Sequence, residues 1–92
     1  MKVKAEVEVE RPSTERLEEL GISAWSIWEC EPSTFPWHYE EQEICYLLRG
    51  KVKVKTKDSE VEFGKGDLVT FPKGLDCTWT VLESVRKHYR FG

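Results

Sequence analysis

The sequence predicts an all-β domain, an antiparallel sandwich or barrel with one short helix near its N-terminus. Two observations support this prediction. Short segments alternate apolar and polar residues with a period of two, and turn-forming residues separate these segments at intervals of roughly 8 to 12 residues. No internal repeat or low-complexity linker divides the 92 residues, so we expect a single domain over residues 1–92.

The N-terminal region predicts a strand followed by a helix. Charged and apolar residues alternate from residue 2 to residue 10, as in a half-buried strand, and Pro12 ends this pattern. Ser13 is a typical N-cap and Gly21 is a typical residue after a helix C-terminus. A helix of about two turns is therefore expected between them.

The middle of the chain predicts extended structure and a hairpin. Residues 22–30 are expected to contain a strand, and alternating aromatic residues favour an extended conformation over residues 35–39. Residues 43–49 predict a further strand. Gly50 is expected to allow a sharp turn into a charged hairpin that covers residues 51–63.

The C-terminal part predicts three more strands. Residues 68–71 form the first, which Asp67 opens in a turn and Pro72 closes because proline cannot donate to a ladder. The other two are expected at residues 77–81 and 86–91. Strand alternation then places two sets of side chains inside the barrel: Glu43, Cys45 and Leu47, and Cys77, Trp79 and Val81.

Composition and charge exclude several functions. The net charge of −3 gives no electrostatic basis for binding nucleic acid, and the lysines of the hairpin face glutamates across it, which indicates cross-strand pairing. No apolar run approaches the roughly 20 residues that a membrane span needs, and the N-terminus lacks the apolar segment of a signal peptide. We therefore expect no association with nucleic acid or membranes.

The composition also suggests a cellular setting. Three cysteines, an odd number without a Cys-x-x-Cys pair, favour a reducing, cytoplasmic location. Abundant glutamate and lysine, with no asparagine, are typical of a thermostable protein, although a consensus-like sequence has the same bias. A chain of this length has a small core, so a homodimer is expected.

Two stretches of the sequence carry spaced motifs. Glu43 precedes Gly50 by six intervening residues, and Gly66 precedes a Pro-x-Gly turn by five. The matching residues are His38, Glu43 and Gly50 in the first motif, and Gly66, Pro72, Gly74 and Cys77 in the second. This pair resembles the two motifs of the cupin family. The small size, the tryptophan-rich entry and the C-terminal HYRFG resemble in particular the ureidoglycine aminohydrolase-like branch, from about residue 7 to residue 91.

The resemblance implies a fold and a metal site. The implied fold is the cupin double-stranded β-helix, a jelly-roll barrel with a pocket between the two motifs. In metal-binding cupins three histidines and a glutamate hold the ion, whereas here Pro36 or Trp37 stands in the first histidine position and Cys77 in the last. His38, Glu43 and Cys77 would then hold one divalent metal, such as Zn, Mn, Fe, Ni or Cu. The alternatives are an exposed or hydrogen-bonded His38 and a Cys77 that packs as a small apolar side chain.

Glu43 is the most informative single residue. Its face should look into the barrel, and a buried carboxylate is costly unless it is paired, hydrogen-bonded or bound to metal. It is therefore a candidate catalytic residue, either as a metal ligand or as a general acid or base. The structural alternative is a carboxylate that bonds to the backbone or to a buried tyrosine.

A concave, mostly apolar cavity with a few polar groups is the usual small-molecule site. The alternative for Phe71 is plain packing in the core. The alternative for His88 is a structural role away from any ligand. The residues expected to line the pocket are Trp37, Cys45, Leu47, Phe71, Trp79 and His88.

Three hypotheses about function follow. The first is a cupin-domain protein that binds a small metabolite in the barrel without catalysis, and the sequence favours it slightly. The second, which the resemblance implies, is a metal-dependent aminohydrolase- or isomerase-like enzyme that acts on a small polar nitrogen compound. The third is a non-catalytic interaction module that acts through a homodimer face.

Overall fold

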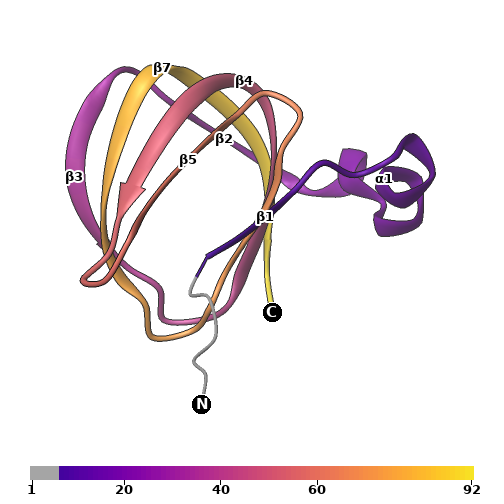
Figure 1. The fold of residues 1–92 in the computed structure, drawn as a ribbon. Helices are drawn as coiled ribbons and strands as arrows, with labels where there is room; N and C mark the ends of the chain where they lie inside the picture. The colour runs from indigo at the N-terminus through magenta and orange to yellow at the C-terminus, as the bar shows by residue number, and fades with distance from the viewer. Residues whose placement is uncertain (1–6) are drawn as a thin grey trace.

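The computed structural model describes residues 7–92 and shows a strongly curved antiparallel sheet that wraps into a small barrel (Figure 1). The elements are β1 (Glu8–Glu10), α1 (Thr14–Leu20), a 3-10 turn (Ile22–Ala24), β2 (Ser26–Cys30), β3 (Ser33–His38), β4 (Glu43–Lys55), β5 (Glu60–Gly64), β6 (Leu68–Phe71) and β7 (Asp76–Phe91). The all-β prediction with one short helix is thus confirmed. The N-terminal part of the strand expected over residues 2–10 lies outside the described residues, and β1 is its C-terminal end.

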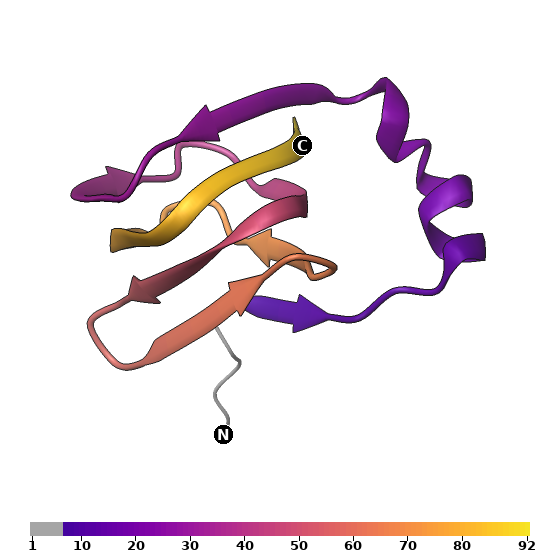
Figure 2. The ribbon, with the colours of Figure 1, turned by 90° about the horizontal axis from the view of Figure 1, so that it is seen from above.

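Two long strands, β4 and β7, form the frame of the barrel. They pair with each other, and the strand order is β1-β6-β4-β7-β2, with β3 also on β7 and β5 also on β4. Each long strand changes its second partner along its length: β4 pairs first with β6 and then with β5, and β7 pairs first with β3 and then with β2. This exchange of partners goes with the strong curvature of the sheet that both ribbon views show (Figures 1 and 2).

The expectation of a turn at Gly50 is wrong, because this glycine lies inside the continuous strand β4. Its φ of 103° and the register shifts against β7 between Leu47 and Val52 mark a bulged bend. A Cβ atom at this position would lie 2.4 Å from the carbonyl oxygen of Ser84. The two strands expected at residues 77–81 and 86–91 are likewise the two halves of β7.

The predicted helix termini are confirmed. The Ser13 side chain accepts a hydrogen bond from the Arg16 backbone N–H at 3.1 Å, and Gly21 adopts a left-handed conformation with φ of 69°. None of the side chains of α1 is buried. The helix lies to one side of the barrel, in the connection from β1 to β2 (Figure 2).

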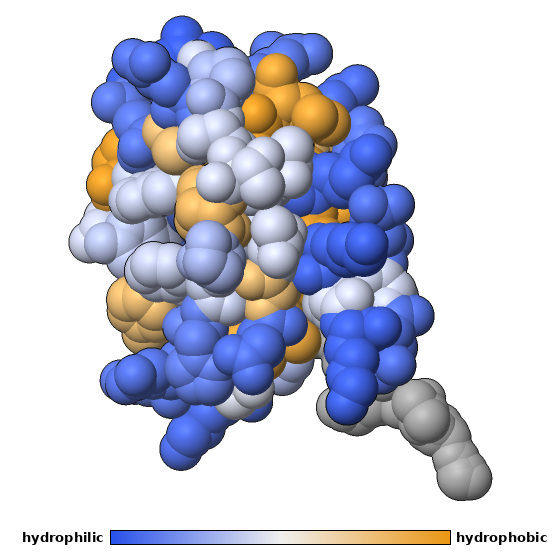
Figure 3. All heavy atoms as spheres, turned by 90° about the vertical axis from the view of Figure 1, so that its left-hand side faces the viewer, coloured by the Kyte–Doolittle hydropathy of each residue, from blue (hydrophilic) through white to orange (hydrophobic). Residues whose placement is uncertain are grey.

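The predicted alternation of inward and outward side chains is also confirmed. The side chains of Glu43, Cys45 and Leu47 on β4 are buried, as are those of Cys77, Trp79 and Val81 on β7. The outer face mixes apolar and polar groups, as the view of the β3 side shows (Figure 3). Within residues 7–92, no helix is both long enough and apolar enough to cross a membrane.

Candidate functional site

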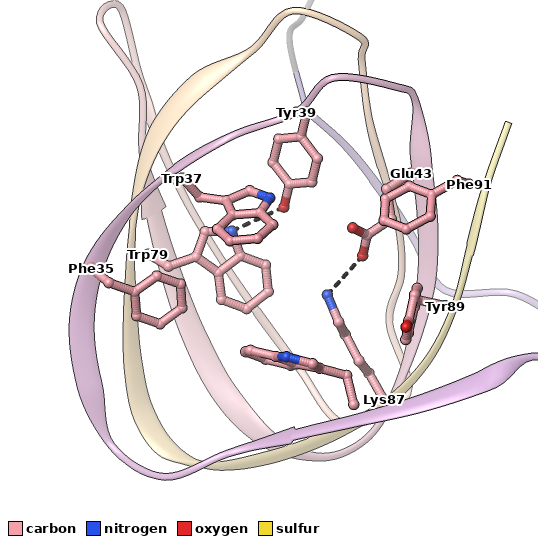
Figure 4. A pocket seen from close by; sticks show the side chains of 9 residues that line it. Phe35, Trp37, Tyr39, Glu43, Trp79, Lys87, Tyr89 and Phe91 are labelled. Carbon is pink, nitrogen blue, oxygen red and sulfur yellow. Dashed lines mark hydrogen bonds and ion pairs between the residues drawn. The ribbon is translucent and has the colours of Figure 1, made fainter.

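One end of the barrel holds a pocket with a volume of about 190 Å³ (Figure 4). Its walls come from β2, β3 and β7, together with Tyr39 just after β3, and β4 contributes its first residue. Trp37 and Phe91 are about half exposed, at 49% and 50%, and therefore mark the open side of the pocket. The lining residues are Trp28, Phe35, Trp37, Tyr39, Glu43, Trp79, Lys87, Tyr89 and Phe91.

A buried ion pair is the main polar feature of the pocket. Lys87 Nζ donates to Glu43 Oε2 at 2.7 Å, and the two side chains are only 6% and 5% exposed. Their charged groups point toward each other between aromatic rings (Figure 4). Within residues 7–92 no hydrogen bond reaches the second carboxylate oxygen, Glu43 Oε1, so this atom is available to a ligand.

Aromatic rings surround the lysine. Its Nζ lies 4.6 Å from the centre of the Trp79 ring, 4.9 Å from that of Trp28 and 5.9 Å from that of Tyr89. These distances are within the range of cation–π attraction. The rings and the Glu43 carboxylate together replace much of the water that a lysine head group normally contacts.

Tyr39 places a hydroxyl group at the same pocket. Its backbone is held by the turn after β6. The Tyr39 N–H donates to the carbonyl oxygen of Leu75 at 2.9 Å, and the Tyr39 carbonyl oxygen accepts from the Gly74 N–H at 2.7 Å. Its hydroxyl oxygen accepts a hydrogen bond from Trp79 Nε1 at 3.0 Å. Burial, with a smaller contribution from the charge of Glu43, raises the pKa of the phenol far above its usual value. The hydroxyl therefore keeps its proton and can donate it to a ligand.

Three of the residues expected at the pocket lie there: Trp37, Glu43 and Trp79. The pocket-lining expectation is wrong for the other four. Cys45, Leu47 and Phe71 are completely buried in the core behind the pocket, because they follow the inward faces of β4 and β6 away from its open end. His88 faces the other side of β7, where its Nδ1 lies 3.1 Å from the carbonyl oxygen of Trp25.

The predicted metal site is not assembled. His38 alternates with the inward Trp37 on β3, so it lies on the outer side, half exposed, with Nδ1 2.7 Å from Asp76 Oδ1. Cys77 is buried, and burial, with a smaller effect of Asp76, raises its pKa to about 11, whereas metal ligation needs the thiolate. Within residues 7–92 no three His, Cys, Asp or Glu side chains lie close enough to share a metal ion.

The residues therefore do not fit the metal that the cupin resemblance implies. Glu43 is the one member of the predicted set that lies at the pocket, and its carboxylate is bonded to a lysine instead of facing histidines. The expectation that His38, Glu43 and Cys77 share one divalent ion is therefore wrong for the described residues.

Sequence reasoning missed several residues of the site. Lys87 is the most important, followed by Trp28, Phe35, Tyr39, Tyr89 and Phe91. For β7 a signal existed: the odd-numbered residues face inward from Cys77 to Val81, and the same parity continues through Val85 to Lys87.

A family model and several solved structures relate this chain to known proteins. The model of the EutQ-like cupin domain matches residues 17–89. A DUF861-family protein from Thermotoga maritima has 55% sequence identity and a TM-score of 0.93, over 95% of this chain and 100% of its own. The Clostridium difficile EutQ protein has 26% identity and a TM-score of 0.67, over 92% of this chain and 66% of its own.

A putative ethanolamine utilization protein Q from Salmonella typhimurium resembles this chain about as closely as the Clostridium difficile protein does. It has 27% identity and a TM-score of 0.67, over 92% of this chain and 68% of its own. A search of curated proteins found no match.

Proposed function

The chain belongs to the EutQ-like cupin domain family, and we propose that its barrel binds a small polar metabolite between Glu43 and Lys87. The observation that carries the proposal is the buried ion pair at an open aromatic pocket. Two desolvated charges are costly in a barrel that only needs to be filled, since apolar side chains of similar volume do this at least as well. Their position at the pocket therefore favours a role in binding a ligand.

The free hydrogen-bonding groups define the ligand. Glu43 Oε1 accepts a hydrogen bond, while Lys87 Nζ and the Tyr39 hydroxyl donate. A ligand with a carbonyl or carboxylate oxygen next to an N–H group satisfies both sides at once. The flat walls of Trp37, Trp79 and neighbouring rings favour a planar group such as an amide.

The volume limits the size of the ligand. The pocket has a volume of about 190 Å³. Pockets for drug-sized ligands are larger, roughly 300 to 1,000 Å³. The ligand is therefore a small molecule, comparable in size to a short-chain amide.

The ureidoglycine aminohydrolase-like branch supplies a related but separate candidate. Its substrates are small polar nitrogen compounds, which agrees with the ligand class proposed here. Its chemistry as a metal-dependent enzyme requires a set of ligands that Glu43, paired with Lys87, does not form with other residues of the described chain. We therefore propose binding of such compounds and derive no metal-dependent step.

The proposal also includes the setting of the protein. We propose a cytoplasmic homodimer of high thermal stability. The three free cysteines support a reducing compartment, and the charge-rich composition supports thermal stability. The domain is small and exposes several large apolar side chains, which supports a second copy as the partner. These side chains are Val9, Ile27, Trp37, Leu82 and Phe91.

The ligand class can be tested with three compounds of equal length. Propionamide carries both a carbonyl and an N–H group, propionate carries only acceptors, and propylammonium carries only donors. We expect propionamide to raise the melting temperature and to shift NMR signals of pocket residues more than the other two. Saturation to 100 times its Kd would stabilise the fold by about 2.7 kcal/mol.

Two variants locate the effect. Glu43→Gln keeps the shape of the side chain but removes the carboxylate, so binding should weaken, whereas Glu62→Gln changes an exposed carboxylate and should leave binding unchanged. If none of the three compounds perturbs the signals of Trp37, Glu43 or Lys87, the proposed function is wrong.

A further inference from the structure

We propose that Lys87 reacts with small aldehydes or ketones in this pocket and forms an imine with them. The inference rests on the proposed function, because the carbonyl compound must enter the same cavity. It adds a covalent step to the proposed binding of a small polar ligand.

The position of Lys87 separates it from the other lysines of residues 7–92. Lys87 is the single lysine among the pocket residues, and its side chain is 6% exposed. Its amine faces the cavity (Figure 4), where a small carbonyl compound can reach it. The remaining described lysines are exposed or half-buried on outer surfaces: Lys51, Lys53, Lys55, Lys57, Lys65 and Lys73. A lysine amine that has lost its proton is a common nucleophile for carbonyl substrates.

Glu43 can transfer the protons that the reaction needs. Its Oε2 lies 2.7 Å from Lys87 Nζ, so it can accept a proton from the ammonium and leave the amine free to attack. The C–N bond then forms, and the carbonyl oxygen takes a proton to give a carbinolamine. Glu43, now protonated, is the proton donor near that oxygen, and the Tyr39 hydroxyl, which keeps its own proton, can donate a hydrogen bond to it.

The second half of the reaction expels water. Glu43, again a carboxylate, takes a proton from the carbinolamine nitrogen and passes it to the carbinolamine oxygen. That oxygen leaves as water, and the nitrogen lone pair forms the C=N bond. In total, one ammonium group and one carbonyl compound give one protonated imine and one water molecule. Atoms and charge balance without an oxidant, a reductant or another reactant.

The surroundings that stabilise the lysine also suit the product. A protonated imine keeps the single positive charge, so the Glu43 carboxylate continues to pair with it. The rings of Trp28 and Trp79, now 4.9 Å and 4.6 Å from Nζ, remain beside a cation. The aromatic walls limit access of water, which would hydrolyse the imine. Conversion of the amine to the imine therefore removes none of the charge pairing that holds the site together.

The test uses propanal with sodium cyanoborohydride, which reduces the imine to a stable propylamine. The full-length protein is treated near neutral pH, and peptide mapping by mass spectrometry gives the initial rate at each lysine. We expect Lys87 to gain one propyl group about 100-fold faster than Lys51 or Lys73, a ratio at the low end for a positioned acid–base partner. Equal or slower modification of Lys87 in the wild-type protein would overturn the inference, and this comparison needs no variant to fold.

Two variants test the assigned roles. Glu43→Gln removes the proton acceptor and should slow alkylation of Lys87 by roughly 100-fold, while the rates at Lys51 and Lys73 stay the same. Lys51→Arg is the matched control and should leave the Lys87 rate unchanged. An unaltered Lys87 rate in Glu43→Gln that is folded by circular dichroism would contradict the proton-transfer role.

The outcomes also separate this inference from the proposed function. If propionamide binds with shifts at Glu43 and Lys87 but propanal does not modify Lys87 preferentially, the imine inference fails and the binding function stands. If neither compound reaches the pocket, both fail together.

Discussion

Replacement of Lys87 by methionine is the most informative test of the ion pair. The change removes the amine but keeps a long, flexible side chain among the aromatic rings. It leaves the Glu43 carboxylate, 5% exposed, without its cation. Breaking a buried pair in this way typically costs about 3 to 5 kcal/mol, because a desolvated charge remains uncompensated. A domain of this size has a total stability of roughly 5 to 14 kcal/mol, so the variant should be clearly less stable.

The double variant Glu43→Leu/Lys87→Met distinguishes a pairing effect from a packing effect. It removes both charges and fills the space with apolar side chains, a change that is often neutral or stabilising. We expect it to lose less stability than Lys87→Met alone, with a coupling energy of at least about 2 kcal/mol between the two positions. The exposed pair of Lys51 and Glu62, 3.6 Å apart and about half exposed, is the matched control. Lys51→Met should change stability by less than about 1 kcal/mol.

Urea unfolding at neutral pH, followed by tryptophan fluorescence, measures all of these quantities. The slopes with urea should be similar among the variants, so that midpoint shifts report stability. The reasoning is refuted if Lys87→Met costs no more than Lys51→Met. It is also refuted if the effects of the two pocket substitutions simply add within about 0.5 kcal/mol.

Three further predictions concern the barrel, the thiols and metal. Gly50→Ala should destabilise the fold by at least about 2 kcal/mol more than Gly74→Ala in chemical denaturation, because both have positive φ but only Gly50 has a backbone atom, at 2.4 Å, where the Cβ would lie. Burial raises the pKa of Cys45 from about 9 to about 12, so the stability that this thiol contributes is complete below about pH 9 and is lost as the pH rises toward 12. The loss should reach about 2 to 3 kcal/mol at pH 11, and Cys45→Ala should show a shallower decline even though it is less stable at neutral pH. After incubation with Zn, Mn, Fe, Ni or Cu salts and dialysis, the protein should retain less than about one equivalent of metal. A chelator should not change its melting temperature. If the wild-type protein retained one equivalent of metal and Glu43→Ala did not, the corrected site would be contradicted.

Much of the fold could be predicted because its signals are local. Ser13 and Gly21 set the ends of α1 through their own hydrogen bonding and backbone conformation. The inward faces of β4 and β7 could be predicted because polarity alternates clearly along them. The path of β4 could not be predicted, since a glycine with positive φ serves equally in a turn and in a bulge. The contact of Gly50 with Ser84, far away in the sequence, decides between the two.

The site was harder to predict because its central contact joins distant residues. Lys87 stands between Arg86 and His88, and such a charged run normally indicates an exposed strand. Its burial becomes favourable only when Glu43, 44 positions away, supplies a carboxylate on the neighbouring long strand. The alternation of side chains along β7 places Lys87 inside the barrel. Without a known partner, however, this position implies an unpaired buried charge, which is energetically costly.

The motif spacing was informative about the backbone and misleading about chemistry. His38 and Glu43 keep a family-like spacing, yet Trp37 takes the inward position on β3 and turns His38 outward to Asp76. The pocket then needs a cation to balance Glu43, and Lys87 supplies it from β7. A lysine differs from a metal ion in this position, because it is fixed to the chain, has no open coordination positions and carries a nitrogen that can act as a nucleophile. The chemistry of this barrel should therefore be sought first among ligands that hydrogen-bond to, or react with, an amine paired with a carboxylate.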